Sequence, residues 1–145
     1  MFVVDTNVLS ELGRPDPDPN AIGWLRRRDG DLLLPAVVVA ELAFGVERMV
    51  PGRRRTALRE LYSSLFSRLS SSIVPFGPDE SFAAGDLLAR AEAAGRPMSS
   101  GDAQVAATAR CRGAAIATRH GLGYEVADLP VIDPFDPALQ GGATR

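Results

Sequence analysis

The chain contains no lysine, and all sixteen of its basic residues are arginine. This absence excludes chemistry that depends on a lysine amine, including a Walker-type phosphate loop, a Schiff base and a phosphoacceptor receiver site. Cysteine and histidine each occur once, as Cys111 and His120. A single cysteine excludes an internal disulfide and a cysteine-cluster metal site. A Ser-His-Asp or Cys-His arrangement would depend on His120 alone.

Long apolar runs are also missing, since no stretch of the sequence approaches membrane-spanning length. The N-terminal "MFVVD" lacks the basic region and apolar core of a signal peptide. These absences predict a cytoplasmic protein with no membrane partner. The net charge is −2, so the chain has no global basic field of the kind that many nucleic-acid-binding proteins carry.

The arginines nevertheless cluster in "LRRRDGD" and "PGRRRTALRE". Two interpretations remain open. Runs of charge usually belong to solvated helix ends, which is the simpler interpretation. Alternatively, the clusters form local patches for phosphate or an acidic partner, because the arginine fork matches phosphate geometry.

Short apolar segments alternate with helical patterns along the chain. At 145 residues, of which 46% are hydrophobic and 23% charged, the sequence predicts one globular domain over residues 1–140, with a flexible tail at 141–145. The alternation predicts an α/β fold, in which helices cover both faces of a mostly parallel sheet. Ligand sites in such sheets lie beyond the carboxyl ends of the strands. Strands are predicted at 2–4, 31–35, 72–76, 114–118 and 129–135, and helices from residue 8 and at 21–28, 36–49, 55–69, 78–95 and 99–113.

Two of the predicted helices are candidates for a hairpin. The segment 36–49 has a β-branched run that favours a strand, but its length and later apolar spacing favour a helix. The segment 55–69 shows the clearest helical stripe of apolar residues. This hairpin could clasp a partner segment or a second copy of the chain, and plain packing within the domain is the other interpretation. The stripe consists of Leu58, Leu61, Tyr62, Leu65, Phe66 and Leu69.

Local signals also mark helix ends. Asn20 is a candidate N-cap for the helix at 21–28, and Asp79 is one for the helix at 78–95. Gly95 is predicted to end the latter helix.

Three of the eighteen acidic residues differ from the rest because apolar or small residues flank them on both sides: Asp5, Glu41 and Asp102. Each also has a structural interpretation. Asp5 can cap the helix that follows it. Glu41 can be a partly exposed residue paired with Arg48. Asp102 can form a capping box with Ser99. For the other acidic residues, solvation is a sufficient explanation, as at Asp16, Asp18, Asp29, Asp31, Glu60, Asp79, Glu80, Asp86 and Glu92.

Taken together, these three carboxylates predict a cation site. Each lies in an element that can face one end of a parallel sheet, where the charges would repel one another without a cation. Mg²⁺ prefers oxygen ligands and keeps several of its waters. Such an ion activates a water and neutralises charge on a phosphate during in-line displacement. Phosphoryl-transfer chemistry is therefore predicted.

Three stretches closely resemble the motifs of PIN-domain ribonucleases, and in particular the VapC toxins of bacterial toxin–antitoxin modules. They are "VVDTNVLSEL", "VVVAELAFGVERM" and "MSSGDAQVAATA", and their order and spacing match over nearly the whole chain. The resemblance implies a PIN fold, with a central parallel sheet of about five strands flanked by helices. It also implies a toxin that cleaves RNA as an endoribonuclease dependent on Mg²⁺ or Mn²⁺. A cognate antitoxin, a homodimer and a toxin–antitoxin hetero-oligomer are implied as partners.

The family's acidic site residues fall on Asp5, Glu41 and Asp102, which the resemblance therefore implies to be catalytic and metal-binding. The residue after the first aspartate matches Thr6, a catalytic candidate that could orient a water or the substrate. Asn7 matches as well, but we favour a local cap or turn hydrogen bond for it.

One part of the family pattern is changed. Where the family commonly has "T-R-N/D", this chain has "ATRHGLGYE", which places His120 in the last position. Thr118 and Arg119 match the pattern and could contact a substrate phosphate. His120 is either a loop residue without a role, or a group that hydrogen-bonds a metal water or phosphate or protonates a leaving oxygen. Because imidazole is a poorer Mg²⁺ ligand than a carboxylate, a second metal site would be weak or absent.

Two other functions fit parts of the sequence less well. A catalytically impaired PIN-fold binding module, acting through its antitoxin or RNA partner, is suggested by His120 but opposed by the three acidic residues. A haloacid-dehalogenase-like phosphatase needs an Asp-x-Asp pair after the first strand, and here Asn7 occupies the second position. Asp133, in "VIDPF", is more simply a turn residue.

Overall fold

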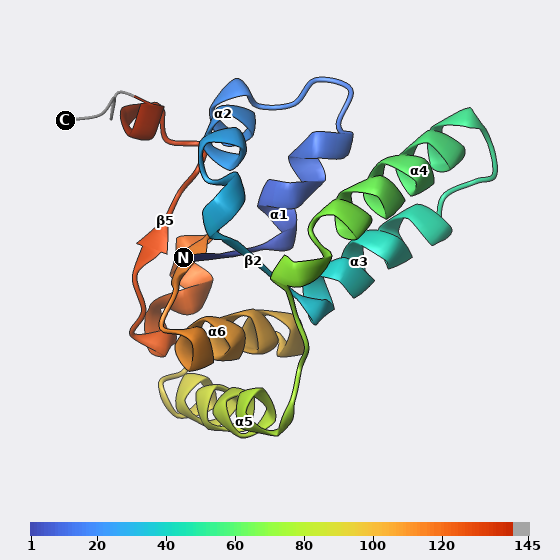
Figure 1. The fold of residues 1–145 in the computed structure, drawn as a ribbon. Helices are drawn as coiled ribbons and strands as arrows, with labels where there is room; N and C mark the ends of the chain where they lie inside the picture. Colours follow the sequence, from blue (N-terminus) through green and yellow to red (C-terminus); the bar gives the residue numbers. More distant parts are fainter. Residues whose placement is uncertain (141–145) are drawn as a thin grey trace.

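A five-stranded parallel sheet in the order β3-β2-β1-β4-β5 forms the centre of the computed structural model, which describes residues 1–140 (Figure 1). The predicted α/β fold with a parallel sheet is confirmed. The predicted tail at 141–145 lies outside the described residues. The strands are β1 Phe2–Val4, β2 Leu32–Pro35, β3 Ile73–Val74, β4 Ala115–Ala117 and β5 Val131–Ile132.

Helices cover both faces of this sheet, as predicted. Figure 1 shows α1 and α2 on one side of the strands, and α5 and α6 on the other. The bounds are α1 Thr6–Leu9, α2 Pro19–Arg27, α3 Ala36–Glu47, α4 Arg53–Arg68, α5 Pro78–Ala93 and α6 Ser100–Arg112. Short 3₁₀ turns are η1 Ser10–Gly13, η2 Asp29–Asp31, η3 Ser70–Ser72, η4 Gly121–Ala127 and η5 Pro137–Gln140.

The middle strand, β1, is buried inside the sheet. It pairs with β2 on one side and β4 on the other, and Val3 and Val4 are fully buried. Helix α6 packs against this strand with a surface of small side chains, including the fully buried Ala103, Ala106 and Ala107. Small residues allow the helix to lie close to the sheet. The N-terminus of α6 is thereby placed near the strand ends.

Two of the predicted helix caps were wrong. Helix α2 begins at Pro19, one residue before the predicted cap Asn20, because proline fits the first helical turn. Its cap is Asp18, whose Oδ1 accepts the N–H groups of Asn20 and Ala21. Helix α5 begins at Pro78, so the predicted cap Asp79 lies inside it.

The N-terminus of α5 is instead fixed by Glu80, whose Oε2 accepts the N–H of Gly77 at 3.0 Å. Glu80 is buried and its other oxygen accepts from Arg112 at 3.3 Å, so the prediction that solvation explains this residue was wrong. Gly95, with φ +67°, follows the end of α5 and is consistent with its predicted role as a helix stop.

The α3–α4 hairpin forms as predicted, and 36–49 is helical rather than extended over most of its length. On the 55–69 stripe, Tyr62, Leu65 and Leu69 are buried in the domain, whereas Leu61 is 38% exposed. Phe44 and Val50, at 64% and 86% exposure, leave apolar surface uncovered on the hairpin.

Arg55 and Arg59 of this hairpin form ion pairs with Glu47. Glu47 accepts hydrogen bonds from Arg59 and from Arg55, and these bonds lower the pKa of its carboxyl to about 2. Part of the "PGRRRTALRE" cluster is therefore paired within the chain. In the other cluster, Arg28 lies over the ring of Phe2 at 5.2 Å. Among the described residues, no helix is long and apolar enough to cross a membrane.

Candidate active site

The carboxyl ends of β1 and β4 meet at Asp5, which is 8% exposed. The Asp5 N–H donates to the Ala117 carbonyl at 3.0 Å, which ties the two strand ends together. The carboxylate caps α1 as predicted, since Oδ1 accepts the Thr6 N–H at 2.7 Å. Its Oδ2 accepts from Asn7 Nδ2 and from Thr118 Oγ1, both at 2.7 Å. Three donors therefore fix the orientation of this carboxylate.

Asn7 does more than make the predicted local hydrogen bond. Its Nδ2 also lies 2.8 Å from Thr118 Oγ1, and its Oδ1 accepts the N–H of Arg119 at 3.0 Å. The amide therefore bridges the segment after β1 to the segment after β4, 112 residues away along the chain. Asn7 holds Asp5 and the Thr118–His120 segment in one arrangement.

Thr118 has no exposed surface and lies behind Asp5, to which its hydroxyl donates. The prediction that Thr118 contacts a substrate phosphate was therefore wrong for this arrangement, because the hydroxyl is already engaged and shielded. Its oxygen also accepts the His120 N–H at 3.1 Å. Thr118 supports Asp5, while the exposed Arg119 and His120 remain candidates for contact with a substrate.

Asp102 lies in the first turn of α6, where the helix dipole favours a negative charge. Ser99 caps this helix by accepting the Asp102 N–H at 3.0 Å, which confirms the predicted pairing of the two residues. The Asp102 carboxylate does not complete a standard capping box, because its Oδ2 accepts from the Ser99 hydroxyl at 2.7 Å rather than from a backbone N–H. Its Oδ1 accepts from the hydroxyl of Tyr124 at 3.3 Å.

Tyr124 is a residue that the sequence reasoning missed. Its side chain is 1% exposed, and its hydroxyl donates to Asp102 in the cleft that Asp5 also lines. Burial raises the pKa of this phenol far above its ordinary value, and the two negative carboxylates raise it further. The signal available in the sequence was an aromatic residue in the glycine-containing stretch "GLGYE", shortly after the predicted fourth strand.

Glu41 reaches the same region from α3. Its Oε2 accepts a hydrogen bond from the Thr6 hydroxyl, and its Oε1 lies so close to Gly101 that a Cβ added to this glycine would come within 2.7 Å of it. The side chain is exposed rather than buried among apolar groups. The predicted pairing with Arg48 was wrong, because that guanidinium lies over the ring of Phe44 instead.

An open cleft of about 580 Å³ lies at this end of the sheet. Arg119 forms part of its wall, and its guanidinium stacks on the Phe135 ring, 3.4 Å from the centroid, and approaches Asp18 at 3.7 Å. The exposed Leu122 forms another part of the wall. The polar and charged residues that line the cleft are Asp5, Thr6, Asn7, Asp102, Arg119, His120 and Tyr124.

The residues around the cleft can be tested for their fit to a divalent cation. Across residues 1–140, no three acidic, histidine or cysteine side chains gather closely enough to form an ion site. However, Asp5 and Asp102 line one open cleft, and Mg²⁺ in proteins is often held by one or two carboxylates plus its own waters. This pair fits such an ion. Glu41 accepts a hydrogen bond from the Thr6 hydroxyl, and it fits an ion contact that is bridged by a water.

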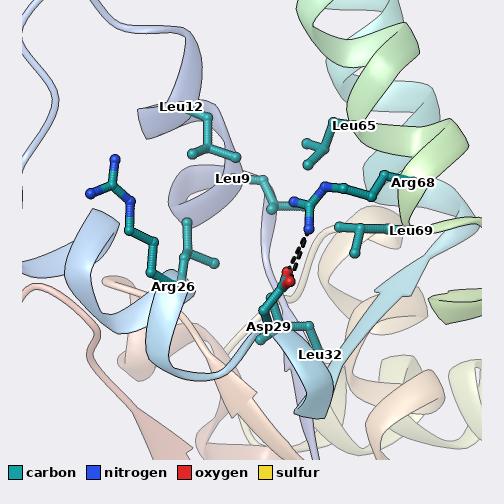
Figure 2. Close-up of a pocket in the computed structure, with 9 residues that line it drawn as sticks. Leu9, Leu12, Arg26, Asp29, Leu32, Leu65, Arg68 and Leu69 are labelled. Carbon is teal, nitrogen blue, oxygen red and sulfur yellow. Dashed lines mark hydrogen bonds and ion pairs between the residues drawn. The ribbon is translucent and has the colours of Figure 1, made fainter.

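A second hollow, of about 190 Å³, lies between α1, η1 and the end of α4. Figure 2 shows leucines from these elements around it, including Leu9, Leu12 and Leu65. Arg68 lies at its edge and forms an ion pair with Asp29 at 2.9 Å, which is drawn as a dashed contact. This groove is apolar with charged edges, and its lining residues are Leu9, Leu12, Leu25, Arg26, Asp29, Leu32, Leu65, Arg68 and Leu69.

Comparison with known proteins gives consistent matches over most of the chain. A family model described as "PIN domain" matches residues 2–121. "VapC ribonuclease Y4jK" from Sinorhizobium fredii is 38% identical over 140 residues, covering 95% of this chain and all of that protein. "Toxin FitB" from Neisseria gonorrhoeae is 34% identical over 139 residues, covering 93% and 99% of the two chains.

Solved structures agree with these sequence matches. A structure described as "FitAB bound to IR36 DNA fragment" has a TM-score of 0.88 and 30% identity, and the match covers 94% of this chain and 96% of the other. The crystal structure of "FitAcB from Neisseria gonorrhoeae" has a TM-score of 0.86 and 31% identity, with 93% and 99% covered.

Proposed function

The chain belongs to the PIN domain family, and from this membership and its acidic cleft we propose that it is the toxin of a type II toxin–antitoxin module, acting as an Mg²⁺-dependent endoribonuclease. Mn²⁺ is an alternative ion. The observation that carries the proposal is the placement of the Asp5 and Asp102 carboxylates in one open cleft, where a buried phenol donates to Asp102. Neither carboxylate has an arginine partner among the ion pairs of residues 1–140.

In this proposal, Asp5 and Asp102 hold the ion directly and Glu41 supports it through water. When bound, Mg²⁺ would lower the pKa of a coordinated water and neutralise charge on the scissile phosphate. The chain itself fixes the ligands: Asn7 and Thr118 hold Asp5, and Ser99 holds Asp102.

The remaining polar groups at the cleft position Glu41 or face the substrate. The Thr6 hydroxyl donates to Glu41 and keeps that carboxylate beside the N-terminus of α6. Arg119 presents a guanidinium, held flat against Phe135, to an RNA phosphate. Such a contact makes RNA binding weaker as salt rises. His120 is exposed at the same wall, and its contact with phosphate or leaving group stays a prediction.

The proposed partners follow from the relatives. The similar solved structures include complexes described as FitAB and FitAcB. We propose that this chain likewise binds a cognate antitoxin protein, forms a homodimer and assembles into a toxin–antitoxin hetero-oligomer. The groove of Figure 2 supports an antitoxin contact, because its leucines would accept apolar side chains and Arg26 would attract an acidic one. The uncovered Phe44 and Val50 on the α3–α4 hairpin are further candidates for a partner contact.

The direct test is cleavage of a structured RNA by the purified protein, free of antitoxin. Cleavage is expected with Mg²⁺ or Mn²⁺, because either ion can be held by the carboxylate pair. It should stop in EDTA and return when the ion is added back. Cleavage that persists in EDTA would contradict the carboxylate-ion mechanism. A folded protein that cuts no RNA with any metal would favour the alternative, a catalytically impaired binding module.

Gly101→Ala tests the part played by Glu41. A Cβ at this position would lie 2.7 Å from Glu41 Oε1, so the carboxylate must move away. We expect cleavage to fall by about 10-fold, because small displacements of a catalytic group are costly. Thermal stability should hold, since only the end of a flexible side chain shifts and alanine favours the helix.

The matched control is Gly85→Ala on α5, where a Cβ meets nothing within 4 Å. This change should leave cleavage unaltered and raise stability by roughly 0.5–1 kcal/mol. Both variants are compared by cleavage rate and by thermal unfolding. Wild-type cleavage by Gly101→Ala would remove Glu41 from the proposed mechanism.

A further inference from the structure

We propose that Tyr124 is a positioning residue whose hydroxyl holds the Asp102 carboxylate ready to receive, together with Asp5, a divalent cation. This inference rests on the proposed metal-dependent function and names a residue outside the three acidic motifs. It concerns how the chain prepares its ligands before the ion arrives.

The first support is the geometry around Asp102. This carboxylate is fixed at both oxygens, with Oδ2 accepting from the Ser99 hydroxyl and Oδ1 accepting from Tyr124. Ser99 belongs to the same helix turn, whereas Tyr124 comes from η4, beyond β4. The tyrosine is therefore the contact that sets Asp102 relative to another part of the fold.

The second support is the burial of the phenol at the wall of the cleft that Asp5 and Asp102 also line. The hydroxyl carries one proton, and it donates this proton to Asp102. With the side chain 1% exposed, water has little access to replace this hydrogen bond. Asp102 is thus held in one orientation before an ion arrives.

The third support comes from comparison with the other tyrosine of the chain, Tyr62. It is buried to a similar degree, at 7% exposure, and stacks on Phe66 within α4. Tyr62 therefore shows that packing alone can bury a tyrosine, so burial by itself does not distinguish Tyr124. Only Tyr124, of these two, donates its hydroxyl to a carboxylate of the cleft.

Tyr124→Phe removes the hydroxyl and keeps the ring, and Tyr62→Phe is the matched control. The full chain, without RNA, is titrated with Mn²⁺ while free Mn²⁺ is followed by electron paramagnetic resonance. We expect Tyr124→Phe to weaken Mn²⁺ binding by about 10-fold or more, as is typical when a group that orients a metal ligand is lost. Tyr62→Phe should bind as the wild type does. Circular dichroism checks that each variant is folded.

A second readout uses cleavage at increasing Mn²⁺. If Tyr124 acts through the ligands, the variant needs more Mn²⁺ for half-maximal cleavage but regains rate at saturation, with an unchanged KM for RNA. A purely structural role would lower the rate at every Mn²⁺ concentration. If Tyr124→Phe fails to fold, the Tyr62→Phe variant is used instead, because Tyr124 is then the only tyrosine of the chain. The ultraviolet absorption of Tyr124 is expected to change when Mn²⁺ binds.

The outcomes separate this inference from the proposed function. Wild-type cleavage together with unchanged Mn²⁺ binding by Tyr124→Phe would overturn the inference and leave the ribonuclease proposal standing. Weakened Mn²⁺ binding by Tyr124→Phe, in a protein that cuts no RNA, would support the inference and contradict the ribonuclease proposal. A wild-type chain that binds no Mn²⁺, or an absorption spectrum that Mn²⁺ leaves unchanged, would overturn the inference.

Discussion

Asp5→Asn is expected to lower RNA cleavage by at least about 100-fold, the largest catalytic effect among the changes considered. Asp5 is the carboxylate at the meeting point of β1 and β4, and it is proposed to contribute negative charge directly to the ion. An amide at this position keeps the size of the side chain but loses the charge. The ion would then be held by Asp102 with little support.

The substitution also disturbs the hydrogen bonds around the site. The carboxylate oxygen Oδ2 accepts from Asn7 and Thr118 at once. If an amide nitrogen takes that place, it faces the donor of Asn7, and a buried donor is left without an acceptor. A loss of about 1–3 kcal/mol in the free energy of unfolding is expected. The protein should remain folded, because its core is untouched.

Asp133→Asn is the matched control for this experiment. Asp133 lies in the turn after β5, where its Oδ1 accepts the Phe135 N–H, a bond that asparagine can also make. This variant should cleave RNA as the wild type does. Rates are measured at fixed Mg²⁺ and again at higher Mg²⁺, with unfolding followed in parallel. Equal cleavage by Asp5→Asn and the wild type would contradict a metal held by Asp5.

The fold was predictable because its signals are local. Apolar runs of strand length alternate with helical spacing, and this alternation was enough to predict the parallel sheet and both helix layers. Strand lengths were less well predicted. The segment 72–76 gives a strand of only Ile73–Val74, and Pro75, which has no N–H to donate, follows directly. Likewise, Pro130 and Pro134 flank the short β5 within the predicted segment 129–135.

The candidate site was predictable where a carboxylate stands out from its neighbours, as Asp5 and Asp102 do. Tyr124 could not be placed in this way, because its contact with Asp102 depends on how η4 folds back over α6. Glu80 was misjudged for a similar reason, since its partner Arg112 lies 32 residues further along the chain. Pairings of this kind depend on tertiary structure, which sequence spacing does not show.

Glu11 is a further buried acidic residue that the sequence did not single out, and Glu11→Ala is expected to give the largest loss of stability. The carboxylate is 3% exposed and closes the proline-rich segment between η1 and α2. Its Oε2 accepts the Asp18 N–H at 2.8 Å, and its Oε1 accepts from Arg14 at 3.2 Å. Removing it leaves the Asp18 N–H without its acceptor, at a cost of about 3 kcal/mol.

For a domain of this size, such a loss lowers Tm by roughly 6–12 °C. Glu11→Gln should lose less, because an amide oxygen can still accept the Asp18 N–H although the charge facing Arg14 is gone. Glu60→Ala, on the exposed surface of α4, is the control and should stay within about 0.5 kcal/mol of the wild type. Thermal unfolding of the three variants gives the comparison. If Glu11→Ala unfolded at the wild-type temperature, the segment would have to be held by other contacts.

The same variant connects stability to the cleft. Asp18, which Glu11 holds through its backbone, caps α2 and lies 3.7 Å from the guanidinium of Arg119. Loosening Asp18 should therefore loosen Arg119, which is proposed to contact the RNA phosphate, without moving Asp5 or Asp102. Below its unfolding temperature, Glu11→Ala is expected to raise KM for RNA while its kcat stays close to that of the wild type. A fall in kcat at unchanged KM would show instead that the segment acts on the carboxylates, and that Arg119 does not set RNA affinity.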